Sequence, residues 1–196
     1  PLFGNRPQYL VLEHLDTAVY GFSYETKEIL EPRYDGFCAQ KKAGIEILLA
    51  HGGDEKHIPI NGNALKRSGF DYVALGHIHK PQVVVKGMAA YAGALEPTDK
   101  NDTGKHGFIR GEIRGGETKI SFVSFAKREY LHLALNVDKM MTARSVVDRI
   151  LEMIKERGAE NLYKFTLKGF RDPELLFERE WDEVSGNILE IVDETV

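Results

Sequence analysis

The 196-residue sequence contains one cysteine, no long apolar run and no large excess of charge of either sign. A lone thiol, Cys38, cannot form an internal disulfide, so the fold depends on packing and the expected compartment is the reducing cytoplasm. Without a stretch of about 20 apolar residues, no membrane-spanning helix is expected. The amino terminus has neither an initiator Met nor the pattern of a signal peptide.

The charge balance limits the classes of partner. Lys and Arg total 26 against 30 Asp and Glu, a net charge of -4, which excludes a nucleic-acid binder whose affinity depends on a large positive surface. Any contact with DNA must therefore be local. A composition of 42% hydrophobic and 29% charged residues is typical of globular proteins, and the length allows one large core or two modest ones.

The hydrophobic period changes near residue 126, which we take as a domain boundary between residues 1–126 and 127–196. The first part is expected to be β-rich, with one short helix over about 64–68 capped by Asn61 or Asn63. Gly115-Gly116 indicates a hairpin turn, because tight hairpins require positive φ. The strands expected in this part span residues 9–12, 18–22, 45–50, 72–75, 82–85, 89–91, 107–113 and 119–123.

The second part is expected to alternate strands and helices. Thr142 is a helix cap, and the apolar stripe after it predicts a helix from 143 to about 157. Asp172-Pro173 indicates the start of a second helix, because proline at the first helical position loses no hydrogen bond. Strands are expected at 131–137, 162–167 and 188–192.

Histidines follow two strongly apolar strands. The strand over 45–50 ends in His51-Gly52-Gly53, and the strand over 71–75 ends in Gly76-His77-Ile78-His79-Lys80. In α/β and layered folds, the carboxyl ends of buried strands collect ligand-binding groups. Neutral imidazole is a common ligand of manganese, iron and zinc. His51, His77 and His79 are therefore candidate metal ligands.

The remaining polar candidates are interpreted as structural or solvated. Arg128 and Tyr130 suit DNA contact and interdomain packing equally, and Trp181 is expected to anchor packing. Four histidines are expected to lie at the surface or in the core: His14, His57, His106 and His132. Three acidic residues are expected to be solvated in a loop: Glu96, Asp99 and Asp102.

Three segments carry a resemblance to a known family: residues 48–52, 69–81 and 91–97. Together they resemble the calcineurin-like metallophosphoesterases, and among these the bacterial SbcD-type DNA repair exonucleases. The resemblance covers residues 17–126, and the segment that follows is similar to the capping domain of those nucleases. It implies an α/β (α+β) fold class, with the second half of a double-sheet sandwich followed by a small capping-like α/β domain.

The resemblance also implies site residues, cofactors and partners. His51 and His77 would bind one of two divalent metal ions and His79 the other, with Mn²⁺ the expected metal. Two such ions polarise a phosphate and bind the attacking hydroxide. Lys80 is a candidate for contact with a phosphate oxygen, or else a solvated lysine. The implied partners are DNA and an SbcC-type ATPase subunit.

The sequence departs from the family pattern upstream of His51. It lacks the Asp-x-His, Gly-Asp and Gly-Asn-His-Asp/Glu elements, and with them the histidine expected to protonate the leaving group, so the catalytic acid is unknown. We therefore expect a C-terminal portion of a longer nuclease, inactive alone and prone to self-association through exposed sheet edges. The alternatives are a metallophosphoesterase acting on nucleotides or phosphoproteins, and a non-catalytic module that binds DNA or an ATPase.

Overall fold

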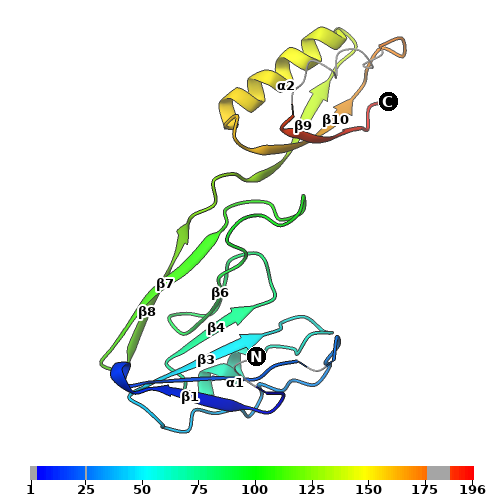
Figure 1. The fold of residues 1–196 in the computed structure, drawn as a ribbon. Helices are drawn as coiled ribbons and strands as arrows, with labels where there is room; N and C mark the ends of the chain where they lie inside the picture. Colours follow the sequence, from blue (N-terminus) through cyan, green and yellow to red (C-terminus); the bar gives the residue numbers. More distant parts are fainter. Residues whose placement is uncertain (1–3, 25, 176–185) are drawn as a thin grey trace. The chain divides into compact units, whose positions relative to one another are not determined.

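The computed structural model describes residues 4–24, 26–175 and 186–196. The chain forms two compact units (Figure 1). The first comprises residues 1–95 and 106–125, and the second comprises residues 96–105 and 126–196. Each unit has its own cluster of buried apolar side chains, so each is described by itself.

A six-stranded sheet forms the frame of the first unit, in the order β1-β2-β3-β4-β6-β5. Its four central strands run parallel, and the edge strands β1 and β5 are antiparallel to their neighbours. A single 3-10 turn, Glu13–Leu15, joins the first two strands. The strands are β1 (Gln8–Leu12), β2 (Thr17–Gly21), β3 (Ile45–His51), β4 (Tyr72–Gly76), β5 (Gln82–Val85) and β6 (Ala89–Tyr91).

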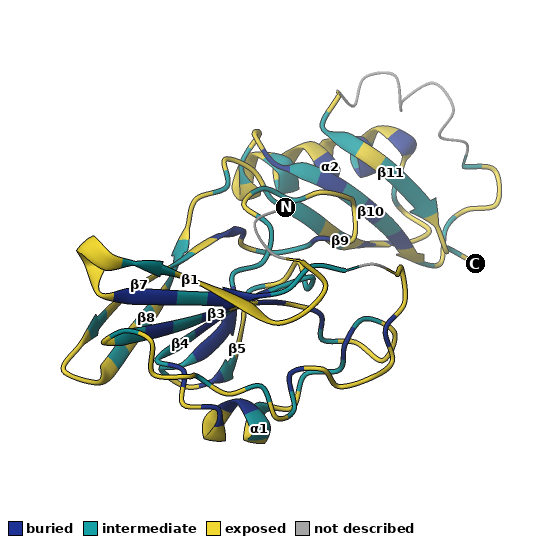
Figure 2. Ribbon diagram, turned by 60° about the horizontal axis from the view of Figure 1, so that its bottom comes forward, coloured by how far each residue is buried: buried dark blue, intermediate teal, exposed yellow. Residues whose placement is uncertain are grey.

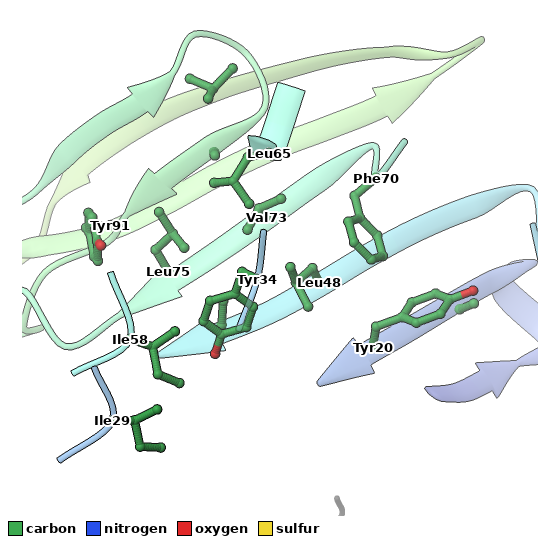
Figure 3. Close-up of a cluster of buried hydrophobic side chains, with 14 residues drawn as sticks. Tyr20, Ile29, Tyr34, Leu48, Ile58, Leu65, Phe70, Val73, Leu75 and Tyr91 are labelled. Carbon is green, nitrogen blue, oxygen red and sulfur yellow. The ribbon is translucent and has the colours of Figure 1, made fainter. Parts of the chain in front are cut away.

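One face of this sheet holds the core. Alternate residues of the strands point to the same side, and Tyr20, Leu48 and Val73 are fully buried there (Figure 3). Helix α1 (Gly62–Arg67) and the long segment between β2 and β3 contribute further buried side chains to this cluster. Asn61 caps the helix by accepting the N–H of Asn63 at 3.0 Å, which is one of the two predicted caps. Buried positions alternate along β3 with intermediate or exposed ones, so one face of the strand is packed more tightly than the other (Figure 2).

A two-stranded hairpin completes the first unit. Strands β7 (Gly107–Arg114) and β8 (Glu117–Ser124) pair along their whole length. Gly115 and Gly116 form the turn with φ of 58° and 77°, which confirms the predicted hairpin. The Thr118 hydroxyl near this turn donates to the Asp71 carbonyl at 2.8 Å and ties the hairpin to the six-stranded sheet.

The second unit is a three-stranded parallel sheet in the order β11-β10-β9, with α2 packed against it. Thr142 caps α2 (Ala143–Arg157) and forms a capping box with Ser145, so the predicted helix is confirmed at both ends. The strands are β9 (Tyr130–Val137), β10 (Leu162–Gly169) and β11 (Ile188–Asp193). Their apolar face meets Val146 and Ile150 of the helix.

Residues 172–175 form a turn. The rest of the helix predicted after Asp172-Pro173 lies outside the described residues, and so does Trp181 with its predicted packing role. Asp102 does not solvate its loop as expected: it is buried and accepts the N–H of Thr98 at 3.0 Å. The carboxylate therefore closes the 98–102 turn from inside.

The described residues form several sheets and two α-helices, which confirms the predicted α/β (α+β) class. In the part of the chain that the structure describes, neither helix has the length and apolarity to cross a bilayer.

Candidate metal centre

His51 and His77 meet at the carboxyl edge of the parallel sheet. His51 is the last residue of β3 and stands in register with Gly76, the last residue of β4. His77 follows directly, and the two imidazole rings lie 5.2 Å apart between centroids. The strand order thus brings together two of the three predicted ligands, as parallel neighbours with loops at one edge must.

The third candidate histidine lies further along the same turn. His79 and Lys80 are both exposed, and the His79 carbonyl accepts the N–H of Ala94 at 2.9 Å. The donor atoms that converge on His77 come instead from Asp54 and His57. The roles of His51, His77 and His79 as ligands and of Lys80 as a phosphate contact stay predictions.

The backbone at this edge is strained. His77 has φ of 99°, a conformation that residues with a side chain rarely adopt and that is concentrated at functional sites. A Cβ at the preceding Gly76 would lie 3.1 Å from Nδ1 of His51, so a side chain there would push the His51 ring away by a few tenths of an ångström. Gly76 therefore lets the His51 ring lie close against the turn.

Two glycines after His51 make a tight loop possible. Gly52 and Gly53 have φ of 151° and 131°, and a Cβ at Gly53 would overlap the hydroxyl of Tyr91. That hydroxyl donates to the Gly52 carbonyl at 2.8 Å, while Gly53 N–H donates to the His57 carbonyl at 2.9 Å. The loop closes on itself and places His57 beside His77, with ring centroids 4.5 Å apart.

Asp54 lies between these two imidazoles. Its carboxylate is 2.8 Å from Nδ1 of His57 and 2.6 Å from Nε2 of His77. It also accepts the backbone N–H of Lys56 at 2.8 Å. The hydrogen bond from His77 and the one from Lys56 hold the pKa of Asp54 well below its usual range. Asp54 is thus an anionic acceptor, and each ring presents an N–H to it.

Tyrosines position the backbone of His51. The Tyr34 hydroxyl accepts the His51 N–H at 3.0 Å, and the Tyr24 hydroxyl donates to the His51 carbonyl. Burial raises the pKa of Tyr91 to about 12, so this phenol remains a neutral donor. Burial of the ring, followed by the nearby His77 and His57, lowers the pKa of His51. The His51 imidazole is therefore neutral and has a lone pair available to a metal.

Asp54 and His57 are not among the ligands that the sequence predicts. The resemblance places a Gly-Asp element upstream of His51, whereas Gly53-Asp54 follows it, and His57 is expected to be a surface or core histidine. An Asp-x-x-His spacing directly after two glycines was the available signal. Imidazole nitrogens with a carboxylate oxygen are donors that suit a transition-metal ion, so the residues present fit at least part of a metal centre.

The chain is 28% identical to YhaO, an uncharacterized metallophosphoesterase of Bacillus subtilis (strain 168). This similarity supports the resemblance of the sequence to the metallophosphoesterase superfamily. The alignment is 172 residues long and covers 82% of this chain and 42% of YhaO, so the chain spans less than half the length of that relative. No family model matches the chain.

Proposed function

We propose that the chain supplies part of the metal centre of an SbcD-type DNA repair exonuclease that hydrolyses phosphodiester bonds. The observation that carries this is the meeting of His51 and His77 at the ends of two parallel strands, on a strained turn. The similarity to a metallophosphoesterase supports the proposal, and so does the family resemblance of residues 48–52, which include His51. The lone cysteine suits the reducing cytoplasm, which we propose as its compartment.

In this proposal His51 and His77 would hold one of two divalent ions, Mn²⁺ by preference, and His79 would contribute to the other. Bound ions would supply the Lewis acidity that phosphodiester hydrolysis requires. Hydrogen bonds with Tyr34 and Tyr24 hold the His51 backbone at the edge of the sheet. Lys80, which is exposed and three residues after the strained His77, would neutralise a phosphate oxygen of the bound DNA.

The chain alone is proposed to be inactive, because it lacks the Asp-x-His, Gly-Asp and Gly-Asn-His elements and the acid histidine of the family. The test joins this chain behind a polypeptide that carries those elements and measures Mn²⁺-dependent release of nucleotides from linear duplex DNA. We expect the joined protein to release nucleotides. We expect no release by its His77→Ala variant or by the chain alone. Release by the chain alone that disappears in His77→Ala would contradict the proposed inactivity.

Substrate class is read in the same assay. Hydrolysis of a nucleotide or phosphopeptide monoester with no release from DNA would favour the alternative, a metallophosphoesterase acting on nucleotides or phosphoproteins. The matched control is His14→Ala, an exposed histidine of the first unit that is outside the cluster. Its activity is expected to equal that of the unchanged joined protein.

A second candidate, a non-catalytic module that binds DNA or an SbcC-type ATPase, is favoured by one observation. The second unit has its own core, with α2 covering one face of a parallel sheet. Parallel sheets are usually covered on both faces, so a partner could occupy the other. A chain with His51, His77 and His79 all changed to Ala keeps its partner if this candidate is right and loses DNA binding if the metal centre is required.

We also propose self-association through the six-stranded sheet. The strand registers place Leu10, Leu49 and Val83 on the same face, opposite the core. These side chains are 48%, 46% and 57% exposed. Exposed apolar groups on one sheet face favour association. Light scattering of the chain is expected to give a mass above one copy, reduced by Leu49→Glu.

A further inference from the structure

The Asp54 carboxylate accepts two imidazole N–H groups at once. Its oxygens lie 2.8 and 2.9 Å from Nδ1 of His57, and Oδ2 also lies 2.6 Å from Nε2 of His77. Carboxylate and imidazole groups whose donor atoms converge in this way form the ligand set of many zinc sites. A surface ion pair would require only one of these imidazoles.

The loop that presents Asp54 is held at both ends. His57 pairs with Ile29 in an isolated bridge, and Ile58 N–H donates to the Ile29 carbonyl at 2.7 Å. At the other end Tyr91 holds Gly52. The donor residues are therefore fixed by the packed interior of the first unit and not by their own contacts alone. Such support is what keeps metal ligands in place before an ion arrives.

We infer that Asp54, His57 and His77 form a one-ion transition-metal site that this chain builds by itself. One oxygen and two nitrogen donor atoms of these residues lie within 4.8 Å of one another. The His51 ring, 5.2 Å from that of His77, is positioned to supply a fourth ligand. His51 and His77 are also ligands that the resemblance implies, whereas Asp54 and His57 are not. The inference concerns ion binding by this chain and does not require nuclease activity.

The donors must move apart to accept an ion. Ligands at about 2.0–2.2 Å from a tetrahedral zinc are roughly 3.3–3.6 Å apart, whereas the hydrogen-bonded donors lie 2.6 to 2.9 Å apart. The side chains of Asp54, His57 and His77 are 44%, 28% and 21% exposed, so the carboxylate, which is the most exposed, can make this shift. The ion would bind the lone pairs of Nδ1 of His57 and Nε2 of His77, with each neutral ring carrying its proton on the other nitrogen, and its positive charge would compensate Asp54.

The donor chemistry selects the kind of ion. Two or three imidazoles with one carboxylate suit Zn²⁺, Co²⁺ or Ni²⁺. Mg²⁺ and Ca²⁺ prefer all-oxygen surroundings and are expected to bind weakly or not at all. Zn²⁺ is therefore the ion to titrate, and Co²⁺ is the spectroscopic probe.

The test is calorimetric titration of the purified, metal-free chain with Zn²⁺, together with the visible absorption of the Co²⁺ form. The variants are Asp54→Asn, His57→Gln and His77→Gln, with His14→Gln as the matched control. We expect one Zn²⁺ per chain and a tetrahedral Co²⁺ spectrum. Because changes outside the ligand set cost about 10–100-fold in affinity, loss of a true ligand is expected to weaken Zn²⁺ binding by more than about 100-fold.

The variants separate this inference from the ligand set that the resemblance implies. His14→Gln is expected to leave Zn²⁺ binding unchanged, because His14 is exposed and outside the cluster. If His77→Gln abolishes Zn²⁺ binding while Asp54→Asn and His57→Gln leave it unchanged, the inference is wrong. Absence of Zn²⁺ binding by a folded chain also overturns it. Circular dichroism of each variant establishes that loss of binding is not loss of folding.

Discussion

Glu46 carries a carboxylate that is almost completely buried, at 2% exposure, within β3. It accepts the Tyr20 hydroxyl at 2.7 Å and the backbone N–H groups of Lys42 and Ala43 at 2.5 and 2.9 Å. Replacing it by glutamine turns one acceptor into a donor that faces other donors. We expect Glu46→Gln to lower the free energy of unfolding by about 2–4 kcal/mol in urea denaturation. Exposed Glu13→Gln, the control, should change it by less than about 0.5 kcal/mol.

The same carboxylate predicts a pH dependence. Burial opposes ionisation of Glu46, but the hydrogen bonds from Tyr20 and the loop amides outweigh it and lower the pKa below its usual 4.5. A lowered folded-state pKa gives stability that is present above pH 4.5 and is lost as the pH falls through the folded value. The unchanged chain should therefore lose more stability than Glu46→Gln between pH 5 and pH 3, that is, across the usual pKa. Equal losses would show that Glu46 does not contribute.

Glycine 53 is required for the loop that carries Asp54. Because a Cβ there overlaps the Tyr91 hydroxyl and φ is 131°, we expect Gly53→Ala to cost about 3 kcal/mol and to weaken Zn²⁺ binding. Gly115→Ala is the matched control, since its φ of 58° is also positive but nothing lies within 4 Å. That change should cost about 1 kcal/mol and leave Zn²⁺ binding intact. Equal losses for the two variants would contradict the steric argument.

At the scale of one element, α2 offers two adjacent residues of similar size in opposite surroundings. Ile150 is fully buried against the second-unit sheet, whereas Leu151 is 36% exposed. Ile150→Ala is expected to cost about 2–5 kcal/mol, because it leaves a cavity among packed side chains. Leu151→Ala should cost under about 1 kcal/mol. Chemical denaturation measures both, and a larger loss for Leu151→Ala would mean that α2 packs by a different face.

Elements whose signal is local could be predicted from the sequence. The bounds of β5 and β6, the Thr142 cap and the Gly115-Gly116 turn all agree with expectation, because each depends on residues within a few positions. The meeting of His51 with His77 was also predictable from strand order. The place of Asp54 was not, because it depends on a backbone bond between Gly53 and His57 and on the distant Tyr91.

For the whole molecule, the two separate cores predict two unfolding transitions. Leu48 belongs to the first cluster and Ile150 to the second, and the clusters share no buried residue. In differential scanning calorimetry, Leu48→Ala and Ile150→Ala are each expected to lower the midpoint temperature of a different transition. For units of this size the shift is roughly 4–8 °C for each kcal/mol lost.

Zn²⁺ binding gives an independent way to identify which unfolding transition belongs to the first unit. An ion that binds only the folded first unit raises the temperature of that unit's transition, in proportion to the logarithm of its concentration. The transition that Zn²⁺ raises should therefore be the one that Leu48→Ala lowers, and Ile150→Ala should leave its Zn²⁺ response unchanged. A single transition lowered by both variants would show that the two cores unfold together, and the compact units of the chain would then be one cooperative structure.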